Sequence, residues 1–214
     1  MIRAPVATDG RFLVIGAVRG LLPEATRVLQ ELDNFSPQAI GIGLSFEELG
    51  GLRQYFVGTA AEPIVPLTSN EVAEAKGLVR FGEVAVPNPS FLGAVEWADA
   101  HQVPVEPLDA SDERSATLFA SNIGYLELVR RTVRERRLTR TPPTPSTPDE
   151  YAIDWDHGIA RGKGSRRLAH ARDEILVQAA LGFGEGKGRT AVLVDRERFS
   201  QVLELFNQAP ARGR

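Results

Sequence analysis

Two short, apolar and largely β-branched segments near the ends of the chain constrain its fold more than any other feature. They span residues 12–20 and 190–198. A continuous apolar run of this length is typical of a strand buried on both faces of a parallel sheet. Each segment closes on an arginine, Arg19 and Arg198, and residues just past the carboxyl ends of parallel strands face the ligand crevice. We therefore expect the two arginines to lie in one pocket.

The order of segments along the chain predicts an α/β fold. The predicted strands are residues 13–18, 40–44, 103–108 and 191–194. Amphipathic helices follow the first two strands, and this β-α-β-α order implies parallel strands joined by crossovers. The third strand contains Pro104 and Pro107, so we expect it at an edge of the sheet. The predicted architecture is a central, mainly parallel sheet with flanking helices.

A helical insertion with a proline-rich linker precedes the last strand. One predicted helix runs from Ser111 to about residue 140, and a second spans residues 166–181. Residues 141–148 (TPPTPSTP) separate these two helical arms, because each proline removes a backbone donor and restricts the residue before it. Too little chain follows the linker to bury a separate core, so residues 1–214 are predicted to form one domain.

The composition excludes several classes of function. With no cysteine, the chain has no disulfide, thiolate nucleophile or cysteine-based metal site. The formal net charge of -3 excludes a globally basic nucleic-acid binder but leaves a local basic patch open. The first residues lack the apolar core of a signal peptide, and no stretch approaches the roughly 20 apolar residues of a membrane span. We expect a cytoplasmic protein without membrane contact.

Five segments of the chain follow one another in the order of a known family. They are IGAVRG at 15–20, IGIGL at 40–44, PLDASD at 107–112, ARDEI at 171–175 and AVLVDRER at 191–198. Their succession resembles the TraB family, which includes pheromone-shutdown, Tiki and GumN proteins. That family has a strand ending in a Gly-x-x-His turn, a strand ending in glutamate, a middle aspartate, an Arg-Asp helix and a second Gly-x-x-His. The resemblance covers most of the chain.

Other residue types stand where the resemblance places the family's metal-binding residues. Arg19 and Arg198 take the two histidine positions, Gly43 takes that of the glutamate, and Asp195 replaces the second motif's glycine. Arginine stays protonated and offers no lone pair to a metal ion. The resemblance therefore implies a member that has lost its metal-hydrolase site, with no catalytic residue, bound metal or cofactor.

The arginines at the strand ends have two interpretations. They form an anion site, with Arg172 as a third member, because guanidinium groups bind phosphate or carboxylate through paired hydrogen bonds. Alternatively, they form internal ion pairs with the carboxylates of Asp109, Asp173, Asp195 or Glu197. The high cost of burying an unpaired charge favours the internal pairs.

A second group of arginines lies on both sides of the proline-rich linker: Arg130, Arg131, Arg134, Arg137, Arg166 and Arg167. They form a basic face for nucleic acid or an acidic protein, or they are solvated helix ends that interact favourably with the helix dipole. No aromatic residues interleave with them, so contact with phosphate groups or protein is expected rather than base stacking.

The histidines give no metal-binding signal. His101, His157 and His170 share no metal-ligand spacing. We expect His101 at an exposed helix end and His157 in a polar loop anchored by Trp155.

These observations predict a non-catalytic binding or scaffolding protein. Its expected partner is a protein, a second copy of the chain or an anionic small molecule held by the arginines. The first alternative is a metal-dependent hydrolase or protease of the TraB family, in which Asp109, Asp195 and Glu197 bind the metal in a shifted arrangement. The second alternative is a ribonucleoprotein or nucleic-acid accessory factor that uses the arginine-rich helices.

Overall fold

A computed structural model describes residues 10–56 and 68–209 of the chain. The elements in these ranges are, in chain order, β1 (Phe12–Ala17), α1 (Leu22–Phe35), β2 (Ala39–Ile42), α2 (Phe46–Phe56), α3 (Ser69–Leu78), η1 (Val79–Phe81), α4 (Pro89–His101), β3 (Val105–Pro107), α5 (Asp112–Asn122), α6 (Tyr125–Arg140), α7 (Pro148–Ile159), α8 (Lys163–Gly184), β4 (Thr190–Asp195) and α9 (Phe199–Gln208).

The four strands in the described ranges form one parallel sheet in the order β1-β4-β2-β3. Strand β4 pairs on both sides, so that Thr190 lies opposite Phe12 of β1 and Ala39 of β2. Strand β3, which contains Pro107, pairs with β2 alone and lies at the edge. The predicted α/β class, the parallel sheet and the edge position of the third strand are therefore confirmed.

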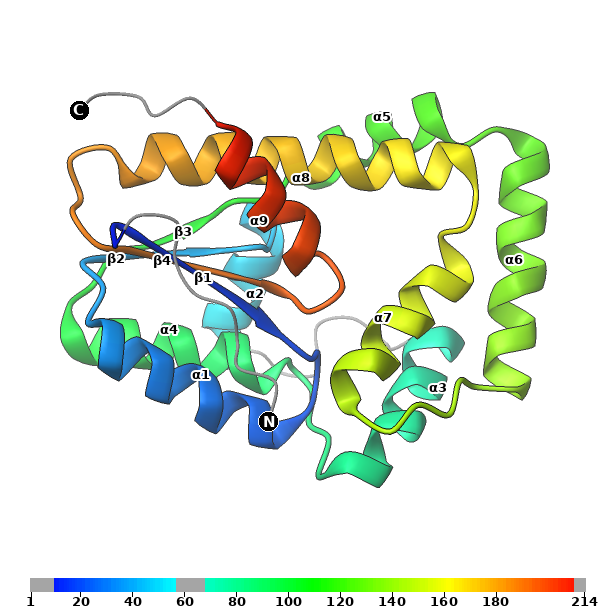
Figure 1. The fold of residues 1–214 in the computed structure, drawn as a ribbon, viewed down its shortest axis with the longest axis horizontal. Coiled ribbons are helices and arrows are strands. Elements are labelled where there is room, and N and C mark those ends of the chain that lie inside the picture. The colour runs from blue at the N-terminus through cyan, green and yellow to red at the C-terminus, as the bar shows by residue number, and fades with distance from the viewer. Residues whose placement is uncertain (1–9, 57–67, 210–214) are drawn as a thin grey trace.

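Helices cover both faces of the sheet (Figure 1). Successive strand residues point to opposite faces. Leu13 and Ile15 of β1 pack in a core with α1, α2 and α4, whereas Phe12 and Val14 pack with α8 and α9. Because both faces are covered, the whole of β1 and β4 is buried, which explains their uninterrupted apolar sequences.

A third group of helices lies beyond the carboxyl ends of the strands (Figure 1). Residues of α3 and α7 share a core of their own with the loop that follows β1, and Leu138 of α6 packs against it. Tyr151 and Trp155 of α7 are the largest side chains buried there. We call this group, α3, α6 and α7, the helical insertion. It differs from the predicted insertion, because it includes α3, which precedes β3, and because α8 packs on the sheet instead. Over residues 10–56 and 68–209, no helix is long and apolar enough to cross a membrane.

The predicted continuous helix from Ser111 to about residue 140 is wrong, because the structure divides it into α5 and α6. Ile123 has an extended backbone (φ -101°, ψ 105°) and is buried, and Gly124 is the N-cap residue of α6. The helix is interrupted here because Ile123 is buried and because Gly124, the next residue, has low helix propensity. The two helices consequently leave this point in different directions (Figure 1).

The predicted polar loop around His157 is also wrong, because His157 lies in helix α7. The side chain of Thr147 caps this helix by accepting a hydrogen bond from the backbone N–H of Glu150 (3.2 Å). Pro148 occupies the first turn, where a missing N–H costs nothing. The last proline of the linker therefore starts a helix, and Trp155 anchors that helix in the core.

Candidate functional site

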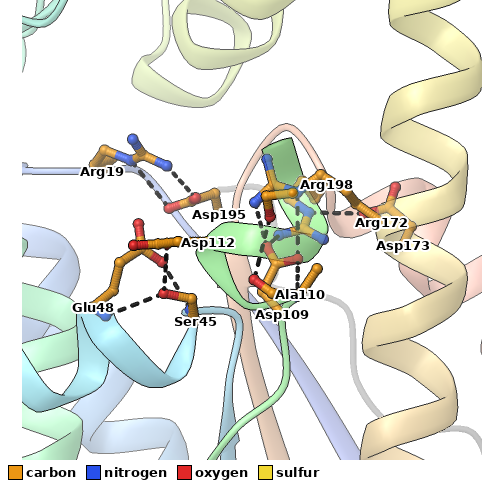
Figure 2. A network of polar contacts seen from close by, with 11 residues as sticks. Arg19, Ser45, Glu48, Asp109, Ala110, Asp112, Arg172, Asp173, Asp195 and Arg198 are labelled. Carbon is orange, nitrogen blue, oxygen red and sulfur yellow. Dashed lines mark hydrogen bonds and ion pairs between the residues drawn. The ribbon is translucent and has the colours of Figure 1, made fainter. Parts of the chain in front are cut away.

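The carboxyl ends of the strands meet at one edge of the sheet, where charged side chains gather (Figure 2). Arg19 follows β1, Asp109 follows β3, and Asp195 and Arg198 lie at the end of β4. Helices α3, α6 and α7 face this edge. A cleft of about 1350 Å³ lies between them, and both Arg19 and Arg198 line it.

Arg19 and Asp195 form the first ion pair of this edge (Figure 2). The Nη2 atom of Arg19 lies 2.5 Å from Oδ2 of Asp195, and Nε lies 3.4 Å from Oδ1. The carboxylate is buried (5% exposed), whereas the arginine side chain is 50% exposed. The charge of Asp195 raises the pKa of Arg19 well above its ordinary value. The buried carboxylate therefore fixes an arginine that remains open to the cleft.

Asp109 is the centre of a second ion-pair network (Figure 2). Its Oδ2 atom lies 2.5 Å from Nη2 of Arg172 and 2.5 Å from Nη1 of Arg198, and its Oδ1 atom accepts from the backbone N–H of Ala110 (2.8 Å). Nε of Arg198 also donates to Oδ1 of Asp173 (2.8 Å). Two guanidinium groups and two carboxylates thus balance in charge.

Burial and pairing act in opposite directions within this network. Burial alone would raise the pKa of Asp109, but Arg198 and Arg172 outweigh it and hold that pKa below its usual range. For Asp173, burial prevails and raises the pKa. Burial disfavours the charge of Arg198, yet Asp109 and Asp173 keep its pKa above the ordinary value. The Arg198 side chain is 15% exposed, against 40% for Arg172, so only Arg172 presents much of its surface to solvent.

The structure therefore shows the internal ion pairs that the sequence favoured for these arginines. It also separates the three predicted pocket carboxylates into two groups. Asp109 lies with Arg172 and Arg198, whereas Asp195 and Glu197 lie close enough to Arg19 to raise its pKa. All three arginines line the cleft, but none of them is without a carboxylate partner.

Five further carboxylates line the cleft that the sequence did not single out: Glu48, Glu71, Glu74, Glu135 and Asp156. Two of them, Glu74 on α3 and Asp156 on α7, have raised pKa values. Burial raises the pKa of Glu74 to about 7, although Arg19 opposes the shift. Burial and the charge of Asp195 raise the pKa of Glu197 to about 8, and burial also raises the pKa of Asp156. No motif marks Glu74 or Asp156, because they reach the cleft only through the packing of the helical insertion.

The arrangement does not fit a metal ion. Within residues 10–56 and 68–209, no group of three or more histidines, aspartates and glutamates is placed to hold one. Asp109 and Asp195 are each bound to a guanidinium group, which competes for the same oxygen atoms. The alternative in which Asp109, Asp195 and Glu197 form a shifted metal site therefore has no support from this geometry.

The six arginines of the predicted basic face do not lie on one surface. Arg131 pairs with Glu135 (3.0 Å), and Arg134 donates to the backbone oxygen of Ile159 in α7 (3.1 Å). Both point toward the rest of the molecule. Arg130 and Arg137 are exposed on the other side of α6, and Arg166 and Arg167 are exposed on α8. Helical spacing places Arg131 off the face that Arg130 and Arg137 share, whereas Arg134, four residues from Arg130, is directed away from that face by its bond to α7.

Compared with known protein families and with curated proteins, the chain gives no match. The resemblance to the TraB family therefore stays a prediction from the sequence.

Proposed function

We propose that this protein binds a small anionic molecule in the cleft, through the open sides of Arg19 and Arg172. One observation carries the proposal. Both arginine side chains are about half-exposed at the cleft, while the carboxylates that pair with them, Asp195 and Asp109, are at most 5% exposed. The buried carboxylates hold the two guanidinium groups in place and leave the other side of each for a ligand.

The hydrogen bonds support a guanidinium group that is bound to its aspartate on one side and open on the other. Arg19 and Arg172 both use Nε and Nη2 for their aspartate. No hydrogen bond among the described residues uses Nη1 of either side chain. A guanidinium group binds carboxylate or phosphate oxygens strongly, and a side chain already fixed loses little entropy when it binds.

The neighbouring glutamates make this binding depend on pH. With pKa values of about 7 and about 8, Glu74 and Glu197 keep a large share of their protons near neutral pH. Protonated carboxyl groups add no negative charge and can donate hydrogen bonds to an anion. As pH rises through these values both groups ionise, so the affinity for an anion should fall.

If the TraB resemblance is correct, Arg19 and Arg198 stand at former metal-binding positions, and the cleft is a hydrolase site converted to binding. Arginine at those positions argues against metal binding, because a guanidinium group supplies no lone pair for a metal ion.

Isothermal titration calorimetry with inorganic phosphate and citrate tests the proposal. We expect saturable binding that is weakened at least about tenfold by Arg19→Gln and by Arg172→Gln. Arg53→Gln is the matched control, because Arg53 is exposed on α2 and does not line the cleft. Binding that neither cleft variant weakens, binding that strengthens between about pH 6 and pH 9, or no binding of either anion would contradict the proposal.

A further inference from the structure

One exposed face of α6 combines apolar side chains and arginines at helical spacing. We call this surface the outward face of α6. It consists of Leu126, Val129, Arg130, Val133, Arg137 and Arg140. Steps of three, four and seven residues place these side chains on one side of the helix. Leu126 is 67% exposed, Val129 44% and Val133 61%, and the three arginines are exposed as well.

The outward face of α6 carries no carboxylate. The acidic residues of the helix, Glu127 and Glu135, are both occupied elsewhere. Glu127 accepts hydrogen bonds from the backbone N–H groups of Gly164 and Ser165 (3.0 and 2.7 Å), and Glu135 pairs with Arg131. Among the described residues, Arg130, Arg137 and Arg140 form no ion pair and no side-chain hydrogen bond.

The position of α6 leaves this face accessible. The helix lies at the end of the molecule farthest from the sheet, and its other side packs on α7 and α3 (Figure 1). From residue 126 to residue 140 the face extends for about 21 Å along the helix axis. That length suits one helical segment of a partner.

We propose that the outward face of α6 is a docking surface for an acidic amphipathic helix of a partner protein. The apolar residues Leu126, Val129 and Val133 lie in the first half of the face, and Arg137 and Arg140 lie in the second. A partner helix with an apolar stripe and flanking carboxylates matches both halves. Helix-on-helix contact buries the exposed valines, and carboxylates pair with the arginines, a residue type enriched at interfaces.

Other occupants fit the face less well. A symmetric contact between two copies through this face would leave the arginines of both copies without a carboxylate partner. Insertion into a bilayer would draw Arg130, which lies between Val129 and Val133, toward the acyl chains. Nucleic acid would satisfy the three arginines but leave Leu126 and the valines exposed to water.

Fluorescence anisotropy with a labelled helical peptide tests the proposal on the full chain. The peptide is about three heptads long, with leucine at the a and d positions and glutamate at e and g. A peptide with lysine in place of glutamate and one of scrambled sequence are the controls. We expect saturable, salt-sensitive binding of the glutamate peptide alone.

Two pairs of substitutions locate that binding. Arg130→Glu with Arg137→Glu, and separately Val129→Ser with Val133→Ser, should each weaken it at least about tenfold. Arg53→Glu with Arg114→Glu changes the net charge equally at exposed arginines of α2 and α5 and should have no effect. No binding of the glutamate peptide, equal binding of a control peptide, or no loss in either α6 variant would overturn the proposal. So would tighter binding of phosphatidylglycerol vesicles or duplex DNA through the same arginines.

Discussion

Arg19, just beyond β1, forms an ion pair with Asp195, the last residue of β4. The pair joins two neighbouring strand ends across 176 positions of the chain. The carboxylate of this pair is buried and the guanidinium group is half-exposed. Asp109 and Arg172 repeat the arrangement beside β3. In both pairs the aspartate positions an arginine at the cleft, which is why the proposed ligand is an anion.

Replacing Asp109 with asparagine should strongly destabilise the fold. The substitution keeps the size of the side chain but leaves Arg198, which is 15% exposed, with Asp173 as its remaining partner. Breaking a buried charge pair typically costs about 3–5 kcal/mol, and the remaining pair places our expectation near 3 kcal/mol. Urea denaturation measures the loss. Asp99→Asn, at an exposed site on α4, should change stability by less than about 0.5 kcal/mol, and an equally small effect of Asp109→Asn would contradict the prediction.

The stability of the protein should fall as pH rises from about 5 to about 8. Glu74 and Glu197 have an ordinary pKa of 4.5, raised to about 7 and about 8 in the folded state. Between these values the folded state holds protons that the unfolded state has released, so ionisation favours unfolding.

Removing those protonation sites tests this pH dependence. Glu197→Gln and Glu74→Gln should each flatten the decline in the free energy of unfolding, measured with urea at several pH values. Glu96→Gln, at an exposed site of α4, should leave the slope unchanged. If the wild-type protein gains stability over this pH range, the assignment of both glutamates is wrong.

Gly77 and Gly50 are predicted to respond oppositely to substitution by alanine. A Cβ atom at Gly77 would collide with the hydroxyl and ring of Tyr151, which is fully buried in the core of the helical insertion. We expect Gly77→Ala to destabilise the protein by about 1–3 kcal/mol despite the higher helix propensity of alanine. Gly50 in α2 has open space around it, so Gly50→Ala should stabilise by about 0.5–1 kcal/mol. The thermal midpoints of both variants test this prediction, and equal shifts of the two midpoints would exclude the proposed collision.

Glu127 is predicted to hold α6 against the start of α8. Its carboxylate accepts hydrogen bonds from the N–H groups of Gly164 and Ser165 and from the Ser165 hydroxyl, and the Ser165 contacts lower its pKa below 4.5. Glu127→Gln should therefore lower the thermal midpoint at neutral pH. The difference from wild type should shrink as pH falls below 4.5, because the wild-type carboxylate then becomes protonated. Glu106→Gln on β3 is the exposed control, and a pH-independent difference would contradict the role of the charge.

The sheet was predictable because its signals are local. Apolar runs at residues 13–18 and 191–194 are strand signals in themselves, and two prolines locate the third strand at an edge. The partner of each arginine was harder to predict. From the sequence, either Asp173 or Asp195 could pair with Arg198, and only the packing of α8 decides for Asp173. Glu74 carried no signal, and Asp156 drew notice only as a neighbour of His157 in a segment predicted to be a polar loop.

The arginines of α6 show a different limit. Within the helix of residues 125–140, periodicity separates only Arg131 from the face that Arg130 and Arg137 share. Arg134 lies at the margin of that face, and its hydrogen bond to the backbone oxygen of Ile159 directs its side chain toward α7. Helical spacing therefore removes Arg131 from the predicted basic face, and the packing of α6 on α7 removes Arg134.

The sheet order has a consequence for how this chain is made. Strand β4 is the last in sequence, yet it lies between β1 and β2, which have no hydrogen bonds to each other. When a ribosome-bound chain has emerged only as far as α8, the apolar strands β1 and β2 are present, but the position of β4 between them is still empty. The sheet closes only when residues 190–195 arrive, so folding depends on contacts of very long sequence separation and should be slow. Until then the unpaired edges of β1 and β2 are exposed to aggregation, and a nascent chain stalled before β4 is a natural substrate for chaperones.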